Sequence, residues 1–262
     1  MEEKDIRFVD GHLHLDIAAV KDPGRASWLA EKGCLAVSWA FGLKVLSKAA
    51  LEVYLVAQER VMARLAAEGL AVRFLTGVHP RNIPADFVRE AVPGLLRPHL
   101  AHPLCAGIGE IGLETGSERE KGILAAQLTL AGTDMARGKV IGIHTPRGDK
   151  DRITAQLLDF MEDFPLDRNR VVMDHASPST IGAILERGYF AGITLSPVKT
   201  SPAELAAMLE THALKADRIM VNTDSGLEFH EDLFSLLSSG LLPDEVLRKI
   251  TRDNALAFYG LA

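Results

Sequence analysis

Short apolar segments alternate with longer amphipathic segments along the whole chain. The amphipathic segments, such as residues 47–68 and 121–138, repeat apolar residues at spacings of three and four, as one buried helical face requires. Eight of the short segments have the length of buried strands: IRFVD (6–10), CLAVSWA (34–40), VRFLTGV (72–78), CAGIGEI (105–111), KVIGIH (139–144), RVVMDH (170–175), FAGITLS (190–196) and RIMVNTD (218–224). The pattern predicts a strand followed by a helix, eight times over.

This alternation favours a parallel sheet, and strands that are apolar on both faces require a sheet covered on both sides. We therefore predict an α/β fold, a (β/α)8 TIM barrel formed by a single domain over residues 1–262. An open doubly wound sheet is the alternative, but the first strand-to-helix turn lacks a glycine-rich phosphate-binding fingerprint. The last segment, residues 243–261, begins with a proline and predicts an extra C-terminal helix that packs on the barrel.

The composition is that of a globular protein and disfavours one class of partner, an extended nucleic acid. Hydrophobic residues make up 47% of the chain and charged residues 24%, which is enough apolar material for a sizeable core. The net charge is −6, and no lysine and arginine cluster is interleaved with aromatic residues, so extended nucleic-acid binding is disfavoured. A small molecule, or the end of a nucleic-acid strand, remains a suitable substrate. No pattern in the sequence specifies an oligomeric state.

Membrane and redox signals are absent from the sequence. The charged start, MEEKDIRFVD, is unlike a secretory signal, and no run reaches the roughly 18 apolar residues of a membrane span, so we expect a cytoplasmic protein without membrane association. The two cysteines, Cys34 and Cys105, each open an apolar strand. We expect buried, reduced thiols there rather than a disulfide or a metal site.

Polar residues gather where the predicted strands end, which is where barrel enzymes build their sites. Residues two apart on a strand point to the same side, so His12 and His14 can share one ion at the barrel mouth. Imidazole and carboxylate ligands accommodate zinc, manganese, iron or magnesium. The full set at the strand ends comprises His12, His14, Glu110, His144, Asp174, His175 and Asp224.

Each of these residues taken alone has a simpler structural explanation. A histidine at a strand end is often only a satisfied polar side chain, Asp174 and Asp224 could cap helices, and Glu110 could belong to a buried ion pair. The whole set would be costly to bury without a shared purpose. Ligands on several strands leave room for two ions about 3.5–4 Å apart, and Glu110, between the two histidine pairs in strand order, is the candidate bridge.

The motifs around these residues occur in a particular order: DGHLHLD, GVHP, GEIGLE, QLTLAG, VIGIHTPR, VVMDHAS, NTDSG and RDNALAFYGL. In this order they resemble the TatD-related metal-dependent hydrolases of the amidohydrolase superfamily, over almost the whole chain. The resemblance implies a TIM barrel with one or two divalent metal ions and hydrolysis by a metal-bound water. Matched motif by motif, His12 and His14 would hold the first ion with Asp224, His144 and His175 would hold the second, and Glu110 would bridge them.

The resemblance also assigns roles beyond the ligands. Asp224 would orient the water, accept its proton and pass it to the leaving group, which makes Asp224 and Glu110 the expected catalytic residues. His79, in GVHP, matches a histidine near the substrate; its alternative is a turn residue before proline. Lys199, after the seventh strand, could contact an anion at the mouth, and its alternative is a solvated loop lysine.

The chain also departs from the family pattern. Pro146 stands where typical members carry a phosphate-binding arginine, and Arg147 follows one position later as the candidate contact. Asn222 replaces a frequent glutamate, and the segments TDSG (223–226) and HAS (175–177) also differ from the family pattern. From these differences together we expect altered substrate contacts around an unchanged metal core. These departures indicate an outlying branch of the family.

Three functions are compatible with these residues. The leading hypothesis is a metal-dependent hydrolase of a phosphoester, including a nucleic-acid end. The second keeps the metals but cleaves a carboxylic ester, lactone or amide, which the displaced arginine and the acidic net charge favour. The third is a non-catalytic metal- or metabolite-binding protein, against which the retention of Asp224 argues.

Overall fold

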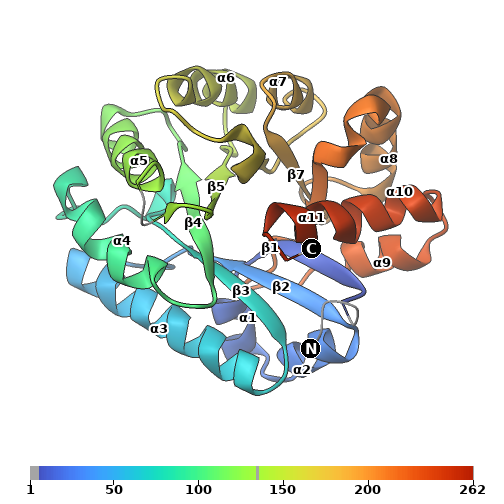
Figure 1. The fold of residues 1–262 in the computed structure, drawn as a ribbon, viewed down its shortest axis with the longest axis horizontal. Helices are drawn as coiled ribbons and strands as arrows, with labels where there is room; N and C mark the ends of the chain where they lie inside the picture. The colour runs from blue at the N-terminus through green and yellow to red at the C-terminus, as the bar shows by residue number, and fades with distance from the viewer. Residues whose placement is uncertain (1–5, 134–135, 262) are drawn as a thin grey trace.

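Eight parallel strands form one sheet in chain order in the computed structural model, which describes residues 6–133 and 136–261 (Figure 1). All eight predicted strands are present. Their bounds are β1 (Phe8–Leu13), β2 (Cys34–Trp39), β3 (Ala71–Thr76), β4 (Cys105–Gly112), β5 (Val140–His144), β6 (Val171–Asp174), β7 (Phe190–Thr194) and β8 (Ile219–Asn222). The first strand extends beyond its predicted end at residue 10, so His12 lies inside β1 rather than after it.

The helices surround the strands in Figure 1. Their bounds are α1 (Leu15–Lys21), α2 (Gly24–Glu31), α3 (Lys48–Ala67), α4 (Val92–Leu100), α5 (Glu118–Ala131), α6 (Lys150–Met161), α7 (Ile181–Glu186), α8 (Pro202–Thr211), α9 (Asp232–Ser238), α10 (Asp244–Arg248) and α11 (Asn254–Phe258). The predicted helix 47–68 is α3, whose N-cap Ser47 accepts a hydrogen bond from the backbone N–H of Ala50. The predicted helix 121–138 already ends at Ala131, and positions 134–135 within it lie outside the described residues.

The sheet curls until its first and last strands meet. The backbone N–H of Asp224 donates to the carbonyl of His12 at 2.9 Å, and that of His14 donates to Ser225 at 2.7 Å. This seam, together with a strand order that follows the chain, confirms the predicted TIM barrel and rules out the open doubly wound sheet. Residues more than 200 positions apart in the sequence, such as His12 and Asp224, therefore become neighbours.

Apolar side chains fill two separate layers. One lies inside the barrel and includes Val37, Trp39 and Leu75, and the other lies between the strands and the outer helices. The inner layer continues into the apolar side chains of α11, which therefore closes one end of the barrel. Cys34 and Cys105 are buried and free, as expected.

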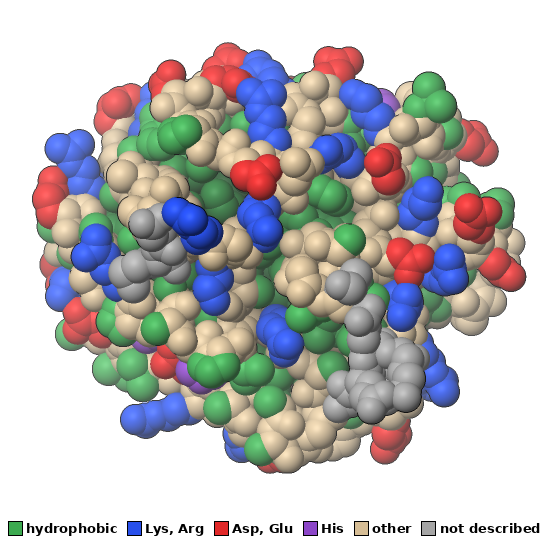
Figure 2. Space-filling model, viewed as in Figure 1, with side chains coloured by type: hydrophobic (Ala, Val, Ile, Leu, Met, Phe, Trp, Pro, Cys, Tyr) green, Lys and Arg blue, Asp and Glu red, His purple; other side chains and the backbone are tan. Residues whose placement is uncertain are grey.

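The C-terminal segment is tied to the amino ends of the first and last strands. Arg252 Nε donates to the carbonyl of Ile6 at 2.7 Å, and Asn254 Nδ2 donates to that of Ile219 at 2.7 Å. Figures 1 and 2 show the molecule from the end that α11 covers, where basic side chains lie among acidic ones. The carboxyl ends of the strands face the opposite way. No helix in the described ranges has both the length and the apolar character needed to cross a membrane.

Candidate metal centre

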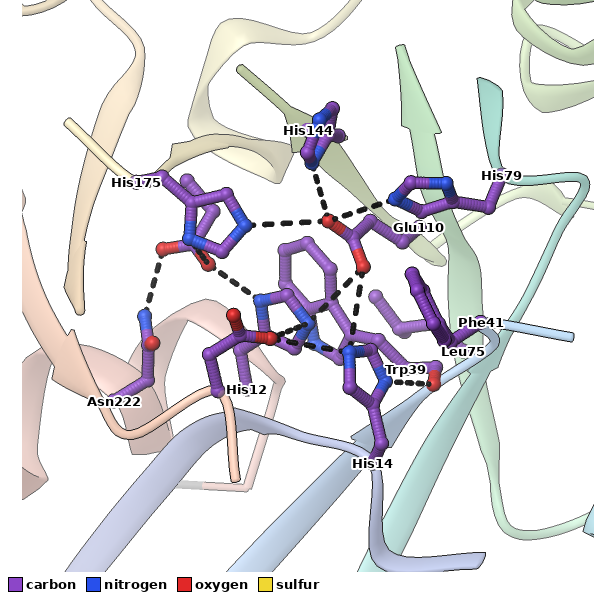
Figure 3. Close-up of polar contacts among 12 residues, drawn as sticks. His12, His14, Trp39, Phe41, Leu75, His79, Glu110, His144, His175 and Asn222 are labelled. Atoms are coloured by element: carbon purple, nitrogen blue, oxygen red, sulfur yellow. Dashed lines mark hydrogen bonds and ion pairs between the residues drawn. The ribbon is translucent and has the colours of Figure 1, made fainter. Parts of the chain in front are cut away.

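The carboxyl ends of the strands bring the four predicted histidine ligands around the carboxylate of Glu110, the fifth predicted ligand (Figure 3). Glu110 lies in β4, and its two oxygens face different histidine pairs. Oε1 is 2.7 Å from His144 Nδ1 and 3.3 Å from His175 Nε2. Oε2 is 3.3 Å from His12 Nε2 and 3.8 Å from His14 Nε2. This is the arrangement that a carboxylate shared between two sites requires.

Asp224 approaches the same cluster from the loop after β8. Its Oδ1 lies 3.1 Å from His14 Nε2 and 3.6 Å from His12 Nε2, and its Oδ2 lies 2.5 Å from Lys199 Nζ. Burial alone would raise the pKa of Asp224, but the charge of Lys199, the hydrogen bond to His14 and, at the low pH where Asp224 titrates, the charge of His175 hold it well below its usual range. Asp224 is therefore a carboxylate at neutral pH.

Two residues of the cluster adopt a left-handed backbone conformation. His175 has a φ of 57° and Asp224 a φ of 52°, in a region that residues with a Cβ rarely populate. Strain of this kind costs about 1–3 kcal/mol per residue and persists where the surroundings impose it, most often at functional sites. Both side chains are thus fixed at the mouth by backbone turns rather than by regular structure.

Each of three histidines has its second ring nitrogen held by a partner. His12 Nδ1 hydrogen-bonds to Asp174 Oδ2, and His14 Nδ1 donates to the carbonyl of Trp39 at 3.0 Å. His144 Nε2 lies 2.7 Å from Glu114 Oε2. Such contacts fix the ring orientation and leave the other nitrogen aimed at the centre, which is the usual arrangement for histidine ligands of metals.

Asp174 owes its place to two neighbours. Asn222 Nδ2 donates to Asp174 Oδ1 at 2.7 Å, and a Cβ at Gly192 would lie only 2.1 Å from the same oxygen, so glycine makes room for the carboxylate. Asp174 caps no helix; it is the last residue of β6, buried beside His12 and His175, and lines neither of the two cavities at the mouth. Asn222 itself is not placed to contact a substrate, because its buried side chain bonds to Asp174 and Thr194.

The residues present fit a divalent metal ion. His12 Nε2 is buried without a hydrogen-bond partner, although carboxylate oxygens of Glu110 and Asp224 lie nearby. One candidate ligand from each of His12, His14 and Glu110 lies within 4.8 Å of the others. Imidazole nitrogen and carboxylate oxygen are the donor types that zinc and related ions take. An ion at this point would satisfy the unpartnered nitrogen.

His79 belongs to the cluster but is unsuited to be a ligand. Its Nδ1 accepts the backbone N–H of Arg81 at 3.1 Å, so the proton of the neutral ring is on Nε2, which lies 3.4 Å from Glu110 Oε1. Burial lowers the pKa of His79 to about 4, and the ring is therefore neutral at pH 7. The geometry makes His79 a hydrogen-bond donor to the centre, which supports the predicted place near the substrate.

The protonation states of two histidines differ for physical reasons. Burial alone would lower the pKa of His12, but the carboxylates of Glu110 and Asp174 raise it to about 10. Burial and the charge of Lys199 lower the pKa of His175 to about 4. His175 is already in the neutral form that binds metals, whereas His12 must lose a proton to do so.

A cavity of about 390 Å³ opens above the cluster. The predicted substrate contacts His79, Arg147 and Lys199 all line it, and so does Arg81. Sequence reasoning missed Arg81 and Glu114. Glu114 is the last residue of the GEIGLE motif, four residues after Glu110, and Arg81 directly follows the GVHP motif, two residues after His79. These positions were the only available signal.

Comparisons with known proteins reveal similarities that span most of the chain. A family model described as TatD related DNase matches residues 9–226. An uncharacterised metal-dependent hydrolase of Methanocaldococcus jannaschii is 26% identical over 273 residues, which cover 97% of this chain and 100% of the relative. The TatD-like protein of Archaeoglobus fulgidus has a TM-score of 0.75 at 28% identity, covering 97% of this chain and 100% of its own. A β-aspartyl dipeptidase of Fervidobacterium islandicum shares the fold, with a TM-score of 0.64 at 17% identity and coverages of 97% and 75%.

Proposed function

Because the chain belongs to the TatD-related DNase family, and is thus a metal-dependent hydrolase of the amidohydrolase superfamily, we propose that it hydrolyses a phosphoester. The end of a nucleic-acid strand is one such substrate. The observation that carries the proposal is the set of three cationic side chains, Arg81, Arg147 and Lys199, which line the cavity above the cluster. Arginine and lysine at this position match the charge of a phosphoryl group.

The proposed ligand set follows the geometry of the centre. His12, His14 and Asp224 would hold one divalent ion, which could be zinc, manganese, iron or magnesium. His144 and His175 would hold a second, and Glu110 has one oxygen facing each histidine pair. When bound, such an ion supplies an acidified water and polarises the scissile bond.

The protein's own side chains would then transfer the proton of the attacking water and bind the anionic phosphoryl group of the substrate. Asp224, held as a carboxylate, would orient the attacking water, accept its proton as the new P–O bond forms, and return it to the leaving oxygen as the old bond breaks. His79 would donate its Nε2 proton in a hydrogen bond to a phosphoryl oxygen. Arg147, for which no ion pair is found among the described residues, would bind the substrate anion.

Hydrolysis rates on a substrate panel test this proposal. The hydrolysis rate of the metal-reconstituted protein would be measured with aryl phosphomonoesters, phosphodiesters and short DNA, and with carboxylic esters and lactones. The Asp224→Asn variant is the inactive control. We expect phosphoester hydrolysis that Asp224→Asn abolishes. Turnover confined to carbonyl substrates would refute the proposal and favour the ester, lactone or amide alternative.

A second arm of the experiment tests the anion contact. Arg147→Ala should raise KM for the phosphoester by roughly tenfold or more, since a hydrogen bond to a charged group is lost. Arg89→Ala is the matched control, because Arg89 is exposed, pairs with Glu90 at 2.8 Å and lies outside the cavity. Unchanged kinetic constants in Arg147→Ala would remove this residue from the site.

A further inference from the structure

A second cavity, of about 370 Å³, adjoins the first one between the loops that follow β5, β6 and β7. Arg147, His175, Val198 and Lys199 line both cavities and form their shared wall. A substrate bound at the metal centre therefore has a neighbouring space on one side. Nothing in the proposed reaction uses this space.

Lys150 lines the second cavity only, at the start of α6. Asp149 before it has a φ of 47°, and this left-handed turn starts the helix so that Lys150 Nζ reaches back to the loop. There it donates to Thr145 Oγ1 at 2.9 Å and to the carbonyl of Pro146 at 3.1 Å. Both acceptors are neutral, and in the described part of the chain no carboxylate oxygen lies within 4.0 Å of this ammonium.

Lys150 therefore has no ion-pair partner among the described residues, in contrast to Lys199, which pairs with Asp224. Burial and the nearby charge of Lys199 lower the pKa of Lys150 to about 8, although the more distant carboxylates of Asp174, Glu114 and Asp151 act in the other direction, so it is mostly protonated at neutral pH. A half-buried ammonium without a directly paired counter-charge is unfavourable. An anion in the cavity would supply the missing partner.

The rest of the lining suits a ligand with an anionic group and a carbon skeleton. Ala176, Pro178 and Val198 provide apolar surface. Glu204 is the one carboxylate on the lining, and its Oε2 already accepts hydrogen bonds from the backbone N–H and the hydroxyl of Ser201, both at 2.8 Å. It therefore serves as part of the cap of α8 and leaves Lys150 and Arg147 to a ligand.

We propose that the second cavity is a subsite for a second anionic group of the substrate, a phosphate or a carboxylate, held by the ammonium of Lys150 with Arg147 at the shared wall. The inference rests on the proposed function only for the first group, which occupies the metal centre. On this account the enzyme prefers substrates with two anionic groups over those with one.

A purely structural role for Lys150 makes a different prediction. Lys150 donates to Thr145 Oγ1, which in turn donates to the carbonyl of Asp174 at 2.7 Å. In the structural alternative, the sole role of Lys150 is to hold this backbone in place just before His175. Loss of such a role would weaken the binding of every ligand alike. Loss of a subsite would weaken only ligands that carry the second group.

Calorimetric titration of the metal-loaded protein with paired ligands separates these cases. One pair is deoxyadenosine 3′,5′-bisphosphate and deoxyadenosine 5′-monophosphate, and the other is 3-phosphoglycerate and glycerol 3-phosphate. We expect the second anionic group to increase affinity by roughly tenfold or more in at least one pair. The pair that shows the gain identifies the second group as phosphate or carboxylate.

Lys150→Met should abolish this gain and leave the binding of the singly substituted ligands unchanged. Lys215→Met should retain it, because Lys215 is also a half-buried lysine that donates to a carbonyl, that of Leu185 at 3.1 Å, but lies outside both cavities. Equal affinities within both pairs, a gain that survives Lys150→Met, or a uniform loss with all four ligands would overturn the proposal. Phosphorus NMR of the ligands after the titration measures hydrolysis separately. The binding data therefore test the subsite even if the protein does not hydrolyse these ligands.

Discussion

Lys199 Nζ lies 2.5 Å from Asp224 Oδ2, so an ammonium from the loop after β7 contacts the acid that follows β8. The same ammonium lies 2.8 Å from His175 Nδ1. Lys199 is therefore not a solvated loop lysine. Its charge acts on two members of the candidate centre, where it favours the ionised form of the acid and the neutral form of the imidazole.

Lys199→Met should move the acid limb of the pH profile of kcat/KM to higher pH. The positive charge of Lys199 helps to hold the pKa of Asp224 low against the effect of burial, so its removal raises that pKa. The carboxylate is then protonated, and activity is lost, at a higher pH than in the wild type. Lys121→Met, on the outer surface of α5, is the control. An acid limb at the same pH in both variants would show that Lys199 does not act on Asp224.

Glu114→Gln should weaken metal binding at His144 by roughly 10–100-fold, as loss of a partner that orients a histidine ligand typically does. The reason is the 2.7 Å contact of Glu114 Oε2 with His144 Nε2. Metal titration by calorimetry would measure the effect. Glu118→Gln, which changes an exposed acid on the same stretch, should bind metal as the wild type does. Equal affinity in both variants would contradict the orienting role.

The double variant His12→Asn, His14→Asn should lose the thermal stabilisation that zinc or manganese gives the wild type. A ligand at 100 times its Kd stabilises the folded state by about 2.7 kcal/mol, which a shift in Tm reports. His212→Asn, at the end of α8 and outside the cavity, should keep the full shift. A full shift in the double variant would mean that the metal binds elsewhere.

Much of the architecture could be predicted from the sequence because it depends on periodic patterns. The strands, α3 and the C-terminal helix follow from apolar periodicity, and the gathering of His12, His14 and His144 follows from the rule that barrel sites lie at strand ends. The conformations of the loops do not follow from any comparable periodic pattern. The contact of Glu114 with His144 and the position of Lys150 depend on turns that a single sequence does not specify.

The metal affinity should fall as the pH falls. His12, with a pKa raised to about 10 by Glu110 and Asp174 against the effect of burial, is protonated in the metal-free protein at neutral pH. Metal binding must displace that proton, so the apparent affinity should drop by up to roughly tenfold per pH unit for each proton released. Calorimetric titrations in buffers of different ionisation enthalpy count the protons. Binding without proton release would contradict the role of His12 as a ligand.

The most direct test of the proposed metal centre is an anomalous difference map from crystals of the zinc-loaded protein, recorded at the zinc absorption edge. We expect one or two peaks beside Glu110, with the first in contact with His12 Nε2 and His14 Nε2 and any second one in contact with His144 and His175. A map with no peak at this cluster, or with zinc bound only elsewhere on the chain, would contradict it.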